Sequence, residues 1–289
     1  MSVLRATVGR SRPLCEGAAR HAIDPARSTD LVGLLTADLA GDTAFYEGLF
    51  GWTSENAGPD FGDYTTFSLP GAAPDAPPRP VMGIMPCPPG AVPSRIWNLH
   101  YRVADCDEAV GRARSLGAAV DAGPESVGGM LRFAMLRDPN GASFGLVEPL
   151  DPSTGFGVWG ETGSIAWAEY HVDGAPADAM RFYVDLLGWE AVTPPWEDPA
   201  NPTPYAALSP RGGDVEFGGC HAAEGFEKSM PPQWSVMVMV ADADALCAKA
   251  VELGGTVAAE PMDVPGLRVA GVATPGGTVV GVHSPRAWV

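Results

Sequence analysis

The sequence predicts an α+β protein in which four β-α-β-β-β modules form two similar domains. The first observation is a repeat, since FYEGLFGW at residues 45–52 returns as FYVDLLGW at residues 182–189. The second is that VADCDEAVGRARSLGAAV, from Val103, returns as VADADALCAKAVELGGTV, from Val240. The third is a weaker echo of RDPNGASFGLV in ATPGGTVVGVH. All three pairs keep one order at an offset of 136 or 137 residues, which indicates a duplicated unit.

Each half of the repeat reads as two modules in succession. In the first half, an apolar strand leads into a helix capped by Asp38, whose side chain suits a backbone N–H of the first turn. A second helix ends at Gly117, a residue suited to the left-handed conformation that closes helices. We expect the Pro-rich stretches 70–80 and 193–204 in hairpins between the second and third strands of a module. The strands of the first half are expected at residues 31–36, 64–70, 80–85, 96–103, 131–137 and 142–148.

Domain boundaries follow from the same pattern. Residues 1–28 carry five arginines without the apolar stretch of a secretory signal, and we take them as a loose leader. A stretch that contains Gly and Pro separates the two halves, as linkers do. The expected division is a first domain at 29–150, a linker at 151–163 and a second domain at 164–289.

Composition restricts the classes of function. Apolar residues make up 46% of the 289 residues and charged residues 18%, which is typical of a folded globular protein. The net charge of −17 argues against nucleic-acid binding, which needs clustered cations. No apolar run reaches the roughly 18 residues of a membrane span. The five cysteines form no CxxC pair, so we expect a reducing, cytoplasmic location.

FYEGLFGW and the closing RDPNGASFGLVEP carry a resemblance to a known superfamily. With the strand and helix order, they resemble the glyoxalase, bleomycin-resistance and extradiol dioxygenase (vicinal oxygen chelate) superfamily, in the tandem two-domain form common in actinobacteria. The resemblance covers roughly residues 28–285. It implies that modules pair into curved, mixed eight-stranded sheets with helices outside, each sheet around a cavity for a small organic molecule. The fold alone does not name the reaction.

The resemblance also fixes where a metal would bind, because metal-dependent members take one ligand from the first and one from the last strand of each module. None of the eight positions holds His, Glu, Asp or Cys, the usual ligands of divalent metals. A register shift of two residues at Trp167 would bring in Glu169, a single carboxylate. We therefore expect no metal and no cofactor. The eight positions are Leu31, Gly83, Asn98, Gly145, Trp167, Gly218, Ser235 and Gly281.

Alternation along a strand places residues two apart on the same face, and so selects the cavity lining. The polar members fall on the second module, at Asn98, His100 and Arg102, and on the third, at Trp167, Glu169 and His171. The same face of the other two modules is mostly apolar. It holds Leu31, Gly33 and Leu35 in the first module and Ser235, Met237 and Met239 in the fourth. If modules two and three pair, one cavity holds two His, a Glu and an Arg. If modules pair within each half, the polar set is divided. We expect the first arrangement, with module one against module four, since it concentrates polarity in one working site.

In the functional interpretation, His171 or His100 moves a proton, Glu169 orients or charges the imidazole, and Arg102 holds an anionic or enolic oxygen. Trp167 would be a stacking platform for a flat ligand. The structural alternative is that these are hydrogen-bonded polar residues at strand ends. The remaining expected ligand contacts are Asn98, Ser235, Met237 and Met239.

Our leading hypothesis is a metal-independent enzyme, of secondary metabolism, that acts on a flat, oxygen-rich aromatic or polyketide-like metabolite. Its chemistry would be enolisation, cyclisation, isomerisation or cofactor-free oxygenation. The alternative is a non-catalytic protein that sequesters a drug or metabolite, for which the acidic charge would suit a cationic drug. A third alternative is a degenerate scaffold that binds a protein partner. We expect a small-molecule ligand, and a monomer or homodimer.

Overall fold

The computed structural model describes residues 29–151, 154–155, 157–213 and 215–286, so the predicted leader lies outside it. These residues form two mixed eight-stranded sheets with four α-helices and two short 3-10 helices. None of these helices is long and apolar enough to cross a membrane. The first sheet has the order β2-β3-β4-β1-β5-β8-β7-β6 and the second β10-β11-β12-β9-β13-β16-β15-β14.

The two halves repeat the same element order. The first half contains β1 (Thr29–Thr36), α1 (Leu39–Phe50), β2 (Thr53–Asn56), η1 (Pro59–Phe61), β3 (Thr65–Leu69), β4 (Arg79–Pro86), β5 (Asn98–Arg102), α2 (Cys106–Ser115), β6 (Ala119–Val127), β7 (Leu131–Arg137) and β8 (Ser143–Pro149). The second contains β9 (Ile165–Val172), α3 (Pro176–Leu187), β10 (Trp189–Val192), β11 (Ala206–Pro210), β12 (Gly218–Ala222), η2 (Gly225–Ser229), β13 (Gln233–Met239), α4 (Ala243–Glu252), β14 (Thr256–Val264), β15 (Leu267–Ala273) and β16 (Val279–Pro285).

The first helix begins at the predicted cap, and the second ends at the predicted glycine. The Asp38 side chain accepts the backbone N–H of Gly41 at 2.9 Å, which caps α1. Asp105 caps α2 in the same way by accepting from Glu108 at 2.8 Å. The chain leaves α2 through Gly117, whose φ of 97° lies in the left-handed region that glycine tolerates.

One hairpin prediction is wrong. Residues 193–204 do join the second and third strands of their module, β10 and β11, but residues 70–80 lie between the third and fourth strands, β3 and β4. The reason is a strand that the sequence pattern does not reveal. The strand after each helix is an edge strand of its sheet, and β2 is the polar segment TSEN, mostly exposed, without apolar alternation.

The predicted pairing of modules two and three around one cavity is also wrong. Strand β1 pairs with β5 within the first half, and Leu31 stands opposite His100. In the second half β9 pairs with β13, and Glu169 stands opposite Ser235. Backbone pairing depends on hydrogen bonds and chain connection, and the division of polar side chains places no constraint on it. The polar set is therefore divided between two sheets.

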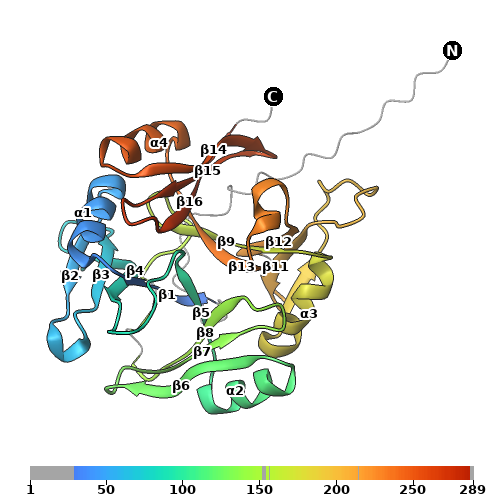
Figure 1. Cartoon of the computed structure of the whole chain (residues 1–289), viewed down its shortest axis with the longest axis horizontal. Helices are drawn as coiled ribbons and strands as arrows, with labels where there is room; N and C mark the ends of the chain where they lie inside the picture. Colours follow the sequence, from blue (N-terminus) through green and yellow to red (C-terminus); the bar gives the residue numbers. More distant parts are fainter. Residues whose placement is uncertain (1–28, 152–153, 156, 214, 287–289) are drawn as a thin grey trace.

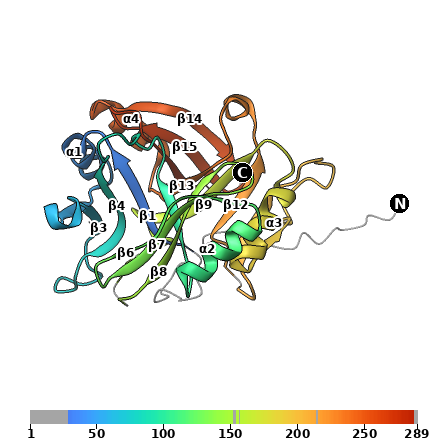
Figure 2. The same cartoon turned by 60° about the horizontal axis from the view of Figure 1, so that its bottom comes forward.

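Modules one and four, and two and three, do meet on the other side of the sheets. Helix α1 contacts α4, and α2 contacts α3, as both views show (Figure 1, Figure 2). One apolar cluster continues through both halves. Within it, Tyr101 of β5 packs edge-on against Tyr183, Trp189 and Trp234 of the second half. The helix-bearing faces of the sheets thus form a shared core.

Asp138 lies at this junction. Its buried carboxylate accepts hydrogen bonds from the hydroxyls of Tyr170, at 2.7 Å, and Tyr183, at 3.0 Å, both in the other half. Its other oxygen accepts the backbone N–H groups of Asn140 and Ala142, so the same side chain shapes the DPNG turn. Burial raises the pKa of Asp138, and the four hydrogen bonds oppose that effect.

In the described part of the chain, the opposite face of each sheet carries no α-helix, and we call it the open face. In β9 the residues Ala168 and Tyr170 point to the core, whereas Trp167, Glu169 and His171 alternate onto the open face. In β5 the core side holds Leu99 and Tyr101, and Asn98, His100 and Arg102 lie on the open face. Each strand that carries predicted site residues therefore presents them away from the shared core.

Asp138→Ala should lower the free energy of unfolding by about 2–4 kcal/mol, because two buried tyrosine hydroxyls lose their acceptor. Urea denaturation measures this change. Asp121→Ala is the matched control, because Asp121 pairs with Arg137 at the exposed surface of the same half, and it should leave stability nearly unchanged. Equal effects of the two substitutions would contradict the role given to the Asp138 junction.

Candidate functional site

The open face of the second sheet carries a connected group of ionisable side chains. Glu169 lies at its centre, on β9, and accepts from His221 Nδ1 at 2.7 Å. His221 lies on the adjacent strand β12, and its Nε2 is 2.9 Å from a carboxylate oxygen of Glu227. Glu227 belongs to η2, which lies between β12 and β13. We call Glu169, His221 and Glu227 the carboxylate–imidazole chain.

Two aromatic residues complete the hydrogen bonding of Glu169. Its Oε2 accepts the indole N–H of Trp167 at 2.8 Å and the hydroxyl of Tyr205 at 2.9 Å. Three donors therefore converge on this carboxylate. These hydrogen bonds hold the carboxylate in one orientation.

His221 is a fixed cation. Both ring nitrogens face carboxylate oxygens, which only accept, so both must carry protons. Burial lowers the pKa of His221, but the hydrogen bonds to Glu169 and Glu227 outweigh burial and raise it to about 10. Burial also opposes ionisation of Glu227, yet the hydrogen bond from His221 lowers the pKa of that carboxyl overall. The chain therefore holds two negative charges and one positive charge at neutral pH.

His171 differs from His221 although the two are cross-strand neighbours on β9 and β12. It is 5% exposed, and its ring centre lies 6.3 Å from that of His221. Burial lowers the pKa of His171, so the ring is neutral at neutral pH. Its Nε2 lies 2.9 Å from the carbonyl oxygen of Pro231. Because a carbonyl oxygen can only accept a hydrogen bond, the Nε2 of His171 carries the ring proton. The lone pair is then on Nδ1.

The other predicted residues of the second half line the same face. Ser235, Met237 and Met239 alternate along β13, and the Ser235 hydroxyl donates to the backbone carbonyl of Glu169 at 3.3 Å. The predicted residues of the second module lie on the first sheet instead. Asn98 donates to Ser94 Oγ at 3.1 Å, and His100 and Arg102 follow it along β5. The structure thus brings Trp167, Glu169 and His171 together and separates them from Asn98, His100 and Arg102.

Three residues of the cluster were not predicted from the sequence: Tyr205, His221 and Glu227. The expected last-strand position, Gly218, is one residue out of register, because Gly219 pairs with Glu169 and faces the open side. Alternation from Gly219 leads directly to His221, so a correct register would have found it. Glu227 and Tyr205 come from outside the strands' alternation, and no pattern points to them.

The positions of the family's metal ligands are filled by neighbouring side chains. A Cβ atom added at Gly83 would lie 2.0 Å from the Tyr64 hydroxyl, and one at Gly219 would lie 1.8 Å from the Tyr205 hydroxyl. Gly145 is covered by the His100 ring, 2.0 Å from the added Cβ, and Gly281 lies under Met237 at 3.1 Å. Glycine at these places allows a side chain from another segment to lie over the sheet.

The donor set does not fit a divalent metal. Within the described residues, no group of three or more His, Cys, Asp or Glu side chains could hold an ion. In the carboxylate–imidazole chain, both nitrogens of His221 are already bound by Glu169 and Glu227. A nitrogen that donates to a carboxylate has no lone pair for a metal.

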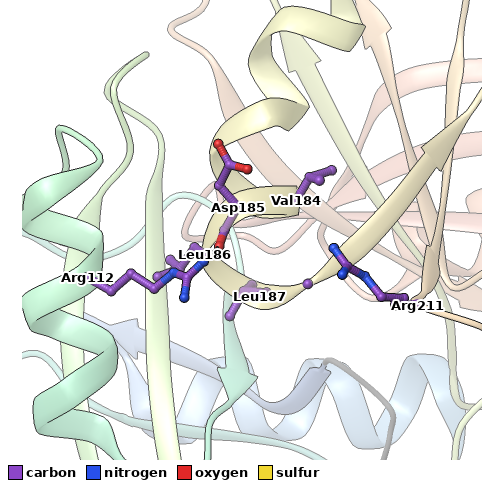
Figure 3. Close-up of a pocket in the computed structure, with 7 residues that line it drawn as sticks. Arg112, Val184, Asp185, Leu186, Leu187 and Arg211 are labelled. Atoms are coloured by element: carbon purple, nitrogen blue, oxygen red, sulfur yellow. Dashed lines mark hydrogen bonds between the residues drawn. The ribbon is translucent and has the colours of Figure 1, made fainter.

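A shallow pocket lies away from this face, at the α2–α3 contact. It has a volume of about 410 Å³ and lies around the C-terminal turn of α3, between Arg112 and Arg211 (Figure 3). Arg112 donates to the backbone carbonyl of Asp185 there. None of the predicted site residues lines this pocket.

Two family models match the two halves. A glyoxalase-like domain matches residues 31–147, and the glyoxalase/bleomycin resistance protein/dioxygenase superfamily matches residues 166–282. A Mycobacterium tuberculosis protein, CFP32, whose name places it provisionally among the glyoxylases, is 34% identical and covers 88% of this chain and 93% of its own length. The anthracycline biosynthesis protein DnrV of Streptomyces peucetius is also 34% identical, covering 83% of this chain and 86% of its own.

Solved structures show the same fold at low identity. A Mn(II)-bound glyoxalase from Novosphingobium aromaticivorans has a TM-score of 0.57 at 17% identity, over 89% of this chain and 81% of that one. Homoprotocatechuate 2,3-dioxygenase from Arthrobacter globiformis has a TM-score of 0.56 at 16% identity, over 89% and 79%. At such identity the likeness concerns the fold alone.

Gly219→Ala should destabilise the protein by about 1–3 kcal/mol, because the new methyl group displaces the Tyr205 ring from Glu169. Thermal or urea unfolding measures the loss. Gly111→Ala is the control, since a Cβ there meets nothing within 4 Å, and should be neutral or slightly stabilising. Adding Tyr205→Ala to Gly219→Ala should recover part of the loss; no recovery would show that the clash lies elsewhere.

The purified protein should contain no stoichiometric zinc, iron, nickel or manganese, because the ligand positions are occupied and His221 has no free lone pair. Elemental analysis of protein purified without chelators checks this, together with ligand binding before and after EDTA treatment. One metal ion per chain, lost together with Glu169→Gln, would overturn the expectation.

Proposed function

The chain belongs to the superfamily of glyoxalases, bleomycin-resistance proteins and dioxygenases, and from this premise we propose that it is a metal-independent enzyme of secondary metabolism. Its substrate is a flat, oxygen-rich aromatic or polyketide-like molecule, and its chemistry is proton transfer on the open face of the second sheet. The observation that carries the proposal is the neutral His171 beside the carboxylate–imidazole chain.

His171 is the proton acceptor in this proposal. Its Nε2–H is held by the Pro231 carbonyl, which fixes both the tautomer and the ring orientation. The lone pair on Nδ1 takes a proton from a carbon next to a carbonyl or from a phenol, leaving an enolate or phenolate. Return of the same proton to another atom of the substrate completes an isomerisation or cyclisation without any outside reactant.

The carboxylates stabilise the imidazolium that forms on His171. Glu227 and Glu169 both raise the pKa of His171 by their charge, while the positive charge of His221 lowers it. These opposing effects leave a base of modest strength, as general bases near neutral pH require. His221 itself donates both N–H groups to carboxylates, so its role is to position Glu169 and Glu227.

The surrounding side chains would place the substrate. Met237 and Met239 supply adaptable apolar contacts along β13, and the half-buried Trp167 ring supplies a flat surface. Gln233 stands opposite His171 on β13 and carries an amide that suits a substrate oxygen. A hydrogen-bond donor in this place is needed because deprotonation of the substrate leaves negative charge on a substrate oxygen.

Two relatives support a role in secondary metabolism. The proteins DnrV and DauV, from Streptomyces peucetius and Streptomyces sp. (strain C5), are named for anthracycline biosynthesis, and they are 34% and 33% identical to this chain. Anthracyclines are flat, oxygen-rich polyketides, the substrate class proposed from the aromatic and polar lining. The four described cysteines, which are free, suit a reducing cytoplasm.

A second candidate function is the sequestration of a cationic drug or metabolite. The observation that favours it is charge, because the carboxylate–imidazole chain keeps a net negative charge and the whole protein carries −17. In that case the same face binds a ligand and nothing turns over. The two functions are distinguished by whether a substitution on this face reduces turnover or reduces ligand affinity.

His171→Ala should reduce turnover by about 10²-fold or more, the usual contribution of a positioned base, with a small effect on affinity. Turnover and calorimetric affinity, measured on a panel of hydroxylated polyketide aromatics, separate the two effects. In the sequestration reading Trp167→Ala should be the more damaging change, through lost contact area. Wild-type turnover in His171→Ala would remove this histidine from the mechanism.

Glu169→Gln should shift the pH dependence of turnover. A base is active above its pKa, so activity falls as the pH drops through the pKa of His171. Since the Glu169 charge raises that pKa, its removal should move the acid limb to lower pH. The pH profile of kcat/KM checks this, and an acid limb that moves upward would contradict the assignment.

A further inference from the structure

The chain between β12 and β13, residues 223–232, lies at the end of the open face that carries His171, and we call it the lid segment. Its backbone hydrogen bonds in η2 are internal, from the Glu227 N–H to the Glu224 carbonyl at 2.9 Å and from the Met230 N–H to the Glu227 carbonyl at 2.8 Å. The exposed residues of the segment include Glu224, Gly225, Lys228, Ser229 and Pro231. A surface segment of this kind opens at a lower free-energy cost than the sheet beneath it.

Two histidines tie the lid segment to the strands beneath it. The Nε2 atom of His221 donates to the carboxylate of Glu227 at 2.9 Å. The Nε2 atom of His171 donates to the carbonyl of Pro231, also at 2.9 Å. Because the two histidines are cross-strand neighbours on β9 and β12, these ties lie side by side. Opening of the lid segment must therefore break hydrogen bonds to both histidines of the candidate site.

The corresponding loop of the first half, between β4 and β5, begins in the same way. Its Cys87 N–H donates to the carbonyl of Thr36 at 2.8 Å. In the lid segment the Ala223 N–H donates to the carbonyl of Val172, also at 2.8 Å. Both carbonyls belong to the last residue of the first strand of their module, β1 or β9. The two loops therefore start from equivalent positions of the duplicated unit, and their next contacts can be compared directly.

The next contact differs because one residue is proline. In the first half the Ser94 N–H donates to the carbonyl of Leu35 at 2.8 Å. The repeat places Pro231 at the position of Ser94, and strand pairing places His171 at that of Leu35. Proline has no N–H, so this backbone bond cannot form, and the Pro231 carbonyl accepts from the His171 ring instead. The half that carries the ionisable site thus ties its loop with the side chains of the site.

His171 is almost enclosed in this arrangement. Its ring is 5% exposed, so it offers a substrate almost no surface to contact. Pro231, which accepts from the Nε2 atom, is itself exposed, so the lid segment separates this edge of the ring from solvent. The strands on either side of β9 are held by backbone pairing, whereas the lid segment is not part of the sheet. The lid segment is therefore the neighbour that can move to uncover His171.

We propose that the lid segment opens to admit substrate to His171, and that the ion pair between His221 and Glu227 is the latch that holds it closed. In the closed state the Pro231 carbonyl keeps the ring proton on Nε2, so the lone pair on Nδ1 is set for proton transfer. His221 and Glu227 are positioning residues, since they act on the base through the lid segment. The gating role rests on the proposed function of His171, whereas the latch is a property of the free protein.

Cleavage by endoproteinase Lys-C measures lid opening without any substrate. The lysines of the chain are Lys228, exposed on the lid segment, and Lys249 on α4, whose ammonium group donates to the carbonyl of Leu49 at 3.2 Å. A protease cuts a folded chain where a stretch of backbone opens, so cleavage after Lys228 reports the open lid. Cleavage after Lys249 reports opening of α4 and serves as the internal reference.

Glu227→Gln and His221→Gln should each raise the cleavage rate at Lys228 about 10-fold, because each removes the charged hydrogen bond of the latch. The double variant should exceed either single variant by no more than about 2-fold, since both remove one contact. Cleavage of the same chains unfolded in urea corrects for the position of Glu227 beside the scissile bond. Glu161→Gln is the control, because its carboxylate pairs with Arg79 outside the lid segment, and it should leave the rate unchanged.

Acceleration at Lys228 without acceleration at Lys249 supports the latch. An unchanged rate at Lys228, or equal acceleration at both lysines, overturns it, because the second result means that the whole fold is loosened.

NMR of the ring nitrogens of His171 tests the coupling to the base. The Nε2 proton should exchange with water about 10-fold faster in Glu227→Gln than in wild type, in parallel with cleavage. Exchange that stays slow while Lys228 is cut faster would overturn the gating of His171. Turnover of His171→Ala is measured separately, so the latch and the proposed function can fail independently.

Discussion

The hydrogen bond from Tyr170 to Asp138 links the core of the molecule to its candidate site. Tyr170 lies on β9 between Glu169 and His171 and points to the opposite side. Because side chains alternate strictly along a strand, the contact that anchors Tyr170 in the shared core also fixes which residues reach the open face. A shift of β9 by one residue would bury Glu169 and expose Tyr170. The contact that joins the two halves therefore also fixes the register of the strand that carries the site.

The two junctions between the halves each contain a buried acid, supplied by different elements. At the contact of modules two and three it is Asp138, in a turn, whereas at the contact of modules one and four it is Asp42, on α1. Asp42 accepts from Thr36, and a Cβ at Gly276 of the facing turn would lie 3.8 Å from its carboxylate. In the repeat, Thr274 occupies the place of Asp138. Each junction thus has a buried acid nearby, on the turn in one case and on the helix in the other.

The repeat in the sequence was sufficient to predict the α+β class, the four modules and their helices, because caps and apolar periodicity are local signals. It did not reveal edge strands such as β2, whose exposed residues do not alternate. It also did not determine which modules share a sheet, since that depends on backbone pairing between distant segments. The open-face positions of Trp167, Glu169 and His171 followed from alternation, but His221 was missed through a register error of one residue at Gly218.

The tyrosines that lie over the glycines limit which substitutions the open faces of the sheets can accept. To place a ligating side chain at Gly219, the chain would need a larger residue there and the removal of Tyr205, whose hydroxyl occupies the same space. Either change alone passes through a less stable protein, with a steric clash or with Glu169 deprived of a donor. The same holds at Gly83 beneath Tyr64. A side chain at either glycine would therefore require two substitutions, one at the glycine and one at the tyrosine that lies over it.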